Sequence, residues 1–256
     1  MSRELVQKQF GDNAENYVSS QVHAQGASLK EMVRLADPQP GWLALDVAPG
    51  GGHSALAIAR HVRQVVAVDI TFPMLQAARD FTRSQGQENI VWVQGNGGRL
   101  PFGAERFDLI TCRVALHHFP RQAAAIADWA RCLKPGGRLV LVDNVGPKDP
   151  VANDYINTFE KLRDPSHGRV HSPAQLARFI KDAGLILLSA ATLRKPMLFH
   201  PWMTRMSVPK TDRATLTRML WESDGSARAF LNPQGEGEKT TFDLQEGLFL
   251  ARKPEQ

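Results

Sequence analysis

Cysteine is scarce in this chain. Only Cys112 and Cys132 occur among its 256 residues. Two thiols are too few for a disulfide framework or for a cluster of thiolate metal ligands. The histidines and carboxylates also lack the spacing of an HExxH or Cys/His site, so we predict no metal.

Long apolar runs are also missing. No uninterrupted apolar run approaches the ~18 residues of a membrane-spanning helix, and neither end of the chain carries an apolar signal segment. We therefore expect a cytoplasmic protein without a membrane span. A hydrophobic content of 43% over 256 residues suits one domain with a packed core, since domains commonly reach about 250 residues.

Basic residues are present, but they are scattered. The formal net charge is +5, yet no run of five or more lysines and arginines occurs. This pattern argues against a nucleic-acid substrate, which is typically bound by a concentrated basic patch. A homodimer is compatible with the sequence, which does not determine the oligomeric state.

What the chain does contain is a glycine-rich turn between two apolar stretches. Residues 43–54 read LALDVAPGGGHS, and residues 65–69 read VVAVD. Each stretch predicts a strand that ends in an acid, Asp46 or Asp69, and the glycines predict a tight turn into a helix. Bare backbone at such a turn lets a bulky ligand approach, and a carboxylate at the next strand end can accept hydrogen bonds from ribose hydroxyls. The pattern indicates an adenosine-containing cofactor.

This first motif alone leaves two cofactor classes open. Gly50, Gly52 and Ala55, with Asp69 nineteen residues after Gly50, also fit the dinucleotide fingerprint. A short-chain dehydrogenase would need a Tyr-x-x-x-Lys pair, and neither tyrosine of the chain is followed by lysine four positions later. A nicotinamide-dependent oxidoreductase of another type remains an alternative at this point.

Short apolar segments alternate with amphipathic ones along the rest of the chain. This alternation predicts an α/β fold, a Rossmann-like sheet of seven mostly parallel strands with helices on both faces. Ligands of such sheets bind at the carboxyl ends of the strands. The predicted strands cover residues 42–47, 65–69, 90–93, 107–112, 138–142, 186–190 and 241–251, and the predicted helices include residues 28–36, 53–61, 73–83 and 121–133, with two more between 150 and 184.

We expect one domain over residues 1–256. Residues 1–40 are expected to form an amino-terminal helical cover, and residues 41–147 the cofactor-binding core. The rest of the sheet and its cap fall in residues 148–194 and 238–256, and residues 195–237 are expected to form a helical insertion over the substrate pocket.

Four further sequence blocks discriminate between the cofactor classes, and the last of them follows the fifth predicted strand. They read GNGGRLPF at 95–102, FDLITCRVALHHF at 107–119, LKPGGRLVLVD at 133–143 and EKLRDPSHGR at 160–169. In order and spacing the chain resembles the class I S-adenosylmethionine-dependent methyltransferases, especially the branch of ubiquinone and menaquinone C-methyltransferases and their uncharacterised bacterial relatives. The resemblance covers essentially the whole chain. It implies methyl transfer from S-adenosylmethionine to a small molecule, with S-adenosylhomocysteine as product and phenolic or quinol-like acceptors among the candidates.

The resemblance also implies which residues hold the cofactor. The turn would face its methionine part, with Asp46 below it, and Asp69 would take the ribose hydroxyls. Two hydrophobic side chains would pack against the adenine, whose edge would meet the loop after the third strand. The implied cofactor-binding residues are Asp46, Ala48, Gly50, Gly52, Asp69, Ile70, Met74, Asn96, Gly97 and, through its backbone, Arg113.

Two positions depart from the family pattern. The family usually has Asp where this chain has Asn96, although an Asn carbonyl can still accept a hydrogen bond from the adenine amino group. Pro49 removes an amide donor from the turn and fixes φ, so the turn must suit a rigid residue. These departures keep a second alternative open, a protein that binds S-adenosylmethionine without catalysis.

Two adjacent histidines follow the fourth predicted strand. His117 and His118 lie beside the place where the methyl group should emerge, and imidazole titrates near neutral pH. Either is a candidate general base, although a histidine here can also serve only to cap or pack. The quinone C-methyltransferases have an Arg-Asn pair at this place, so the departure puts quinone specificity in doubt.

Polar residues in the expected roof and cover are candidates for contact with the substrate. Two histidines and an arginine follow the fifth strand, and their chemistry suits an anionic or phenolic molecule. Solvated loop residues would look the same in the sequence. The substrate-binding candidates are Tyr17, His23, His167 and Arg169, with His171 and His200 in the same segments.

Overall fold

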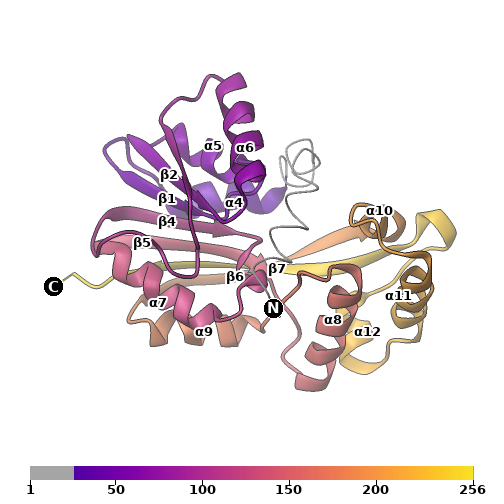
Figure 1. Cartoon of the computed structure of the whole chain (residues 1–256). Helices are drawn as coiled ribbons and strands as arrows, with labels where there is room; N and C mark the ends of the chain where they lie inside the picture. The colour runs from indigo at the N-terminus through magenta and orange to yellow at the C-terminus, as the bar shows by residue number, and fades with distance from the viewer. Residues whose placement is uncertain (1–25, 256) are drawn as a thin grey trace.

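The computed structural model describes residues 26–255. Their centre is a seven-stranded sheet with the order β3-β2-β1-β4-β5-β7-β6 (Figure 1). The first five strands run parallel, and β7 pairs antiparallel with both β5 and β6. This confirms the predicted fold class. The strands are β1 (Leu43–Val47), β2 (Gln64–Asp69), β3 (Ile90–Gln94), β4 (Phe107–Arg113), β5 (Leu133–Asn144), β6 (Ile186–Leu198) and β7 (Thr241–Arg252).

Helices cover both faces of the sheet, as the alternating pattern predicts. On one face α4 and α5 bury Met32, Ile58 and neighbouring apolar residues against the strands, with α6 beside α5. On the other face α7 and α9 enclose a second core around Trp129. The helices are α4 (Ala27–Ala36), α5 (His53–Ala59), α6 (Phe72–Ser84), α7 (Gln122–Cys132) and α9 (Pro173–Asp182).

The last two strands reach far beyond the rest of the sheet. β6 continues to Leu198 because residues 192–198 pair with residues 241–247 of β7. The prediction that this strand ends at residue 190 and that the insertion begins at residue 195 is therefore wrong, and the helical part starts at Phe199. Pro196 obscured the strand in the sequence, but β6 is an edge strand, where a missing amide donor is tolerated.

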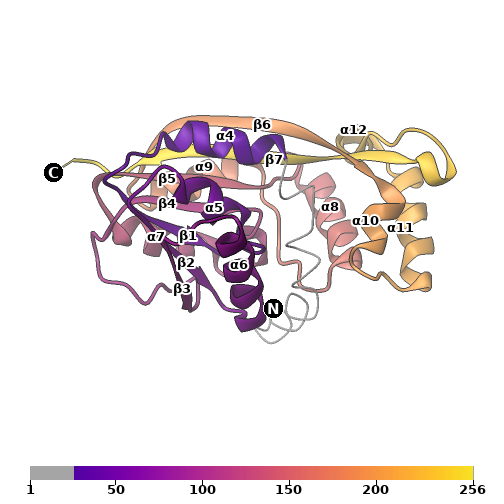
Figure 2. The ribbon, with the colours of Figure 1, turned by 90° about the horizontal axis from the view of Figure 1, so that it is seen from above.

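A helical lobe surrounds this ribbon of two strands (Figure 2). Its core is aromatic, because Trp202 stacks on Phe159 at 5.1 Å between ring centroids and meets Phe242 edge-on at 4.9 Å. Both views place the lobe beyond the carboxyl ends of β4 and β5. Its helices are α8 (Pro150–Arg163), α10 (Phe199–Thr204), α11 (Lys210–Glu222) and α12 (Gly225–Leu231).

The amino-terminal cover is described only in part. The helix predicted at residues 28–36 is α4, whereas the preceding helical piece, Tyr17 and His23 lie outside the described residues. Within residues 26–255, no helix is both long enough and apolar enough to span a bilayer.

Candidate functional site

The turn between β1 and α5 has the backbone that its glycines predict. Ala48, Gly50 and Gly52 all have positive φ, at 52°, 55° and 86°. A Cβ on Gly52 would lie 3.1 Å from Cβ of Ala78 on α6, so this position has no room for a side chain. Pro49 fits the turn, and its carbonyl accepts a hydrogen bond from Gly52 N at 3.0 Å. The carbonyl of Pro49 thus takes part in the turn although the residue has no amide donor.

Two buried carboxylates end β1 and β2 beside this turn. Asp46 accepts from Ser54 Oγ at 2.6 Å and from Thr111 Oγ1 at 2.8 Å, and Asp69 accepts from Thr71 N at 2.9 Å. Burial raises the pKa of each to about 6. The raised pKa means that each carboxyl group holds its proton more tightly in the folded state than in the unfolded chain. The free energy of unfolding therefore falls as pH rises from 3.8 to about 6 and the two groups ionise. A partner that donates hydrogen bonds to them would offset this cost.

The loop after β3 is packed tightly against the sheet edge. A Cβ on Gly97 would lie 2.7 Å from Cγ1 of Val47 and 3.0 Å from Cζ of Phe119. Trp129 Nε1 donates to Gly97 O at 2.7 Å and fixes the loop from the α7 side. Asn96 Oδ1 accepts from Gly98 N at 3.0 Å, so its amide group is held by the loop itself. The loop therefore lies close beside the glycine turn, with Gly97 buried and Asn96 and Gly98 partly exposed.

We expect Gly97→Ala to lower the free energy of unfolding by about 1–3 kcal/mol, the usual cost of forcing a methyl group into a packed site. Gly98→Ala is the matched control, because a Cβ there would lie 3.4 Å from Asn96 Oδ1 and 3.8 Å from the Phe119 ring. Urea unfolding of both variants checks the difference. Equal stability of the two would contradict the packing argument.

The remaining predicted cofactor residues surround the same strand ends. Ile70 follows β2 and is half-buried, whereas Met74 lies in the first turn of α6 with 1% of its surface exposed. Arg113 is the last residue of β4, and its Nε donates to Ser28 Oγ of α4 at 3.4 Å. The structure thus gathers all ten predicted cofactor residues at the carboxyl edge of β1–β4.

His117 forms a close pair with a carboxylate at the end of β5. It lies in a 3₁₀ turn, η1 (Leu116–His118), and its Nδ1 is 2.6 Å from Asp143 Oδ1. Its backbone N donates to Asp143 Oδ2 at 2.7 Å. Burial has the largest single effect and lowers the pKa of His117, but the charge and hydrogen bond of Asp143 together with the charges of Glu160 and Asp164 outweigh it, and the pKa is raised. The pair fixes the ring with Nδ1 toward Asp143.

Sequence reasoning assigned no role to Asp143. The sequence nevertheless contained a signal for Asp143. This acid lies at the end of the strand next to β4, and the carboxyl ends of neighbouring parallel strands meet at the sheet edge where the histidines lie. Unlike Asp46 and Asp69, however, Asp143 follows no glycine turn that would mark it.

Two more histidines pack around His117. The His118 ring lies 4.1 Å from the His117 ring, and its Nδ1 is 2.8 Å from Ser166 O. Burial, then the charge on His117, lowers the pKa of His118 to about 4. His167, whose ring is 5.7 Å from that of His117, has its pKa lowered to about 2, chiefly by burial. His117 is thus the histidine of this cluster whose pKa is raised.

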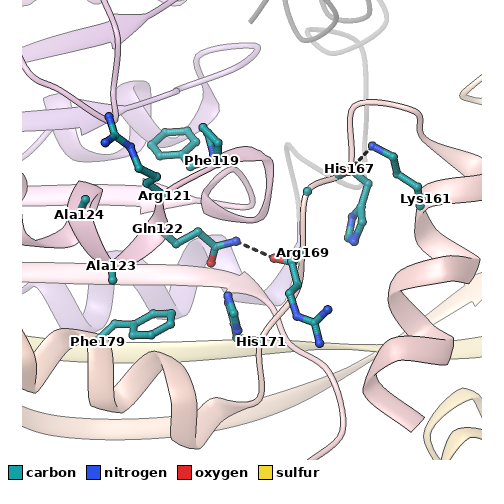
Figure 3. Close-up of a pocket in the computed structure, with 12 residues that line it drawn as sticks. Phe119, Arg121, Gln122, Ala123, Ala124, Lys161, His167, Arg169, His171 and Phe179 are labelled. Carbon is teal, nitrogen blue, oxygen red and sulfur yellow. Dashed lines mark hydrogen bonds between the residues drawn. The ribbon is translucent and has the colours of Figure 1, made fainter. Parts of the chain in front are cut away.

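A cavity of about 680 Å³ adjoins this cluster (Figure 3). We call it the basic pocket. Of the four predicted substrate-contacting residues in the described roof segments, His167, Arg169 and His171 line the basic pocket. The fourth, His200, lies on α10 in the lobe, where its Nδ1 is 3.8 Å from Glu238 Oε1. No residue of the predicted insertion, 195–237, lines this pocket. Its walls are residues 119–124, Lys161, residues 167–169, His171 and Phe179.

A metal is not part of the arrangement that these contacts describe. Within residues 26–255, no group of three or more histidines, cysteines and acids is placed to hold a metal ion.

Comparison with known proteins agrees with the geometry. A family model described as a methyltransferase domain matches residues 45–141. The uncharacterized methyltransferase YcgJ of Bacillus subtilis (strain 168) is 34% identical over 231 residues, which cover 89% of this chain and 91% of that protein. A crystal structure of the Bacillus subtilis YcgJ protein gives a TM-score of 0.85 at 32% identity, covering 90% of this chain and 99% of that one. A demethylmenaquinone methyltransferase of Lactiplantibacillus plantarum is 34% identical over 49% of this chain and 55% of that protein.

The sheet order, the glycine turn and the acids at the strand ends define a Rossmann-like enzyme that binds an adenosine cofactor. The full-length similarity to YcgJ then selects the cofactor class. The chain belongs to the class I S-adenosylmethionine-dependent methyltransferases. It is an enzyme of methyl transfer, which removes the nicotinamide and the non-catalytic alternatives.

Proposed function

We propose that this enzyme methylates a small molecule whose accepting atom must lose a proton, as in a phenolic or quinol-like compound. The observation that carries this proposal is the 2.6 Å contact between His117 and Asp143 at the carboxyl edge of the sheet. A histidine oriented by a carboxylate can accept a proton from the methyl acceptor. An amine acceptor that is already unprotonated would not need such a base. The demethylmenaquinone methyltransferase among the relatives agrees with such an acceptor, whereas His117 and His118 differ from the Arg-Asn pair of that branch.

The residues at the strand ends fit the cofactor. S-adenosylmethionine supplies an electrophilic methyl group on its sulfonium. The positive-φ turn presents bare backbone, and Asp69 has a buried carboxylate whose ionised form gains from hydroxyl donors. The Gly97 loop, where a Cβ would clash at 2.7 Å, supports the adenine edge with backbone alone. We assign Asp46, Ala48, Gly50, Gly52, Asp69, Ile70, Met74, Asn96, Gly97 and Arg113 to the cofactor on these grounds.

The chain's own contribution to the chemistry is positioning and proton removal. Holding the acceptor in line can account for about 7–11 kcal/mol of the barrier. With S-adenosylmethionine bound, the acceptor atom would bond to the methyl carbon as the S–CH3 bond breaks and S-adenosylhomocysteine leaves. The acceptor's proton would move to His117 Nε2, and Asp143 would stabilise the resulting imidazolium. His118, with its pKa lowered to about 4, stays neutral and packs beside this pair.

The decisive experiment supplies methyl-labelled S-adenosylmethionine and a bacterial metabolite extract, and identifies the labelled product by mass spectrometry. A labelled phenol, quinol or related acidic acceptor supports the proposal. A label found only on a protein or a nucleic acid would overturn it.

Asp143→Asn should shift the pH dependence of turnover. Catalysis needs neutral His117, so the rate rises with pH through the raised pKa of His117. Without the carboxylate charge, the pKa-lowering effect of burial on His117 is opposed only by the weaker charge effects of Glu160 and Asp164, so this pKa falls and the acidic limb moves to lower pH. The plateau should fall about 10- to 100-fold, since a hydrogen bond to a charged group contributes about 1.5–3 kcal/mol. The pH profile of turnover, measured with an identified acceptor, checks this prediction. An acidic limb at the same pH in the variant and the wild type would contradict it.

A further inference from the structure

We propose that the basic pocket binds the anionic group, a carboxylate or a phosphate, of a ring-bearing acceptor. This inference rests on the proposed function, because it specifies the chemistry of the molecule that is methylated. Three properties of the pocket carry it: the charge of its walls, their aromatic surface, and their hydrogen bonds to His117.

The walls carry cationic groups and no acid. Arg121, Lys161 and Arg169 line the cavity together with His171, and no aspartate or glutamate is among its described lining residues. Arg169 pairs with Asp154, which is outside the lining, and both side chains are about half exposed or more, so this pair is weak and can yield to a ligand.

Lys161 is held in place without being neutralised. Its Nζ donates to the carbonyl oxygens of Pro165 and His167, both at 2.7 Å, and Figure 3 shows the side chain reaching across to His167. Carbonyl partners orient the ammonium group but leave its full charge. Among residues 26–255 no acid forms an ion pair with Lys161, so an anion in the cavity would gain this charge without first displacing one of them.

Part of the cavity lining is apolar. Phe119 lies above and Phe179 of α9 below in Figure 3, with Ala123 and Ala124 of α7 between them on the left. Small-molecule sites typically combine aromatic surface with a few polar groups that fix orientation. Two phenylalanines beside several cations therefore suit an aromatic ring that carries a negative charge.

The pocket is built onto the segment that carries the proposed base. Gly168 N and Arg169 N both donate to His117 O at 3.0 Å, and Gln122 Nε2 donates to Arg169 O at 2.7 Å, closing the wall against α7. Phe119 also packs on Gly97 in the loop proposed for the adenine edge. A molecule anchored here lies beside segments that are hydrogen-bonded to the His117 backbone and packed on the Gly97 loop.

The test uses two probes of nearly equal shape, salicylate and its neutral amide, salicylamide. Calorimetry is performed on the enzyme saturated with S-adenosylhomocysteine. We expect salicylate to bind at least about tenfold tighter than salicylamide, since hydrogen bonds to charged groups contribute about 1.5–3 kcal/mol and 1.4 kcal/mol corresponds to tenfold. The double variant Arg121→Gln/Arg169→Gln should lose this preference.

The matched control is Arg178→Gln. Arg178 lies on α9, the helix that contributes Phe179, but its side chain is 79% exposed and does not line the cavity. The control should keep the preference for salicylate. Equal binding of the two probes, binding of neither, or equal loss of preference in the control and the double variant would each overturn the inference.

The cofactor measurement separates this inference from the proposed function. S-adenosylhomocysteine should bind all variants with the affinity of the wild type. If it binds but salicylate is not preferred, the anionic acceptor is wrong and methyl transfer to another small molecule stands. If it does not bind the wild-type enzyme, the cofactor assignment itself fails.

Discussion

We expect His117→Asn to lower the rate of methyl transfer about 100- to 10,000-fold, the usual contribution of a positioned general base. Asn was chosen because its amide nitrogen can still donate to Asp143 at the place of Nδ1, 2.6 Å away in the wild type, while Nε2 is removed. The fold and the affinity for S-adenosylhomocysteine should stay unchanged. Single-turnover rates on an identified acceptor, together with calorimetry of the cofactor, separate these two effects.

His118→Asn is the matched control for this variant. It also retains a donor at the Nδ1 position, here toward Ser166 O at 2.8 Å, and it also removes Nε2. With its pKa lowered to about 4, His118 is a much weaker base, so its loss should cost far less. If the two variants lost the same amount of activity, or if His117→Asn kept full activity, the assignment of the base to His117 would be wrong.

The sequence predicted the parallel half of the fold well because its signals there are local. Strands β1 to β3 are short and apolar, and each ends at or beside an acid or a glycine, so these ends can be read directly. The glycine turn was predictable for the same reason, since positive φ at Gly50 and Gly52 demands glycine. By contrast, β5 begins at Leu133, five residues before the predicted start at residue 138.

The long ribbon of β6 and β7 was not predictable in the same way. Residues 192–198 are mostly exposed and include Pro196, and they form a strand only because residues 241–247 lie beside them. Register with a segment about 50 residues away leaves no local mark in a single sequence. The start of the helical lobe was misplaced for this reason.

The candidate catalytic site illustrates the same limit. His117 and His118 are equivalent as neighbours in the sequence, and only the fold gives one of them Asp143 and the other a backbone carbonyl. The charge of Asp143 helps to raise the pKa of His117, whereas burial and the neighbouring charge on His117 lower the pKa of His118. Their different roles are therefore a product of tertiary structure.

We expect Asp69→Ala to weaken binding of S-adenosylhomocysteine about 100-fold or more. Two hydrogen bonds from ribose hydroxyls to a carboxylate would be lost, at about 1.5–3 kcal/mol each. Asp80→Ala, which removes an exposed acid from nearby α6, should leave the affinity unchanged. Calorimetry on both variants, with circular dichroism to check the fold, makes the comparison. Wild-type affinity in Asp69→Ala would refute the ribose assignment.

The pH dependence of binding provides an independent test of the same residue. Burial raises the pKa of Asp69 to about 6, so the free enzyme protonates this group in mildly acidic solution. Ribose hydroxyls favour the ionised carboxylate, which means that cofactor affinity should fall as pH drops from about 7 to about 5. Asp46 titrates near the same pH, so Asp69→Asn should reduce this slope without abolishing it. An identical slope in Asp69→Asn would place the titrating group elsewhere and remove Asp69 from the ribose site.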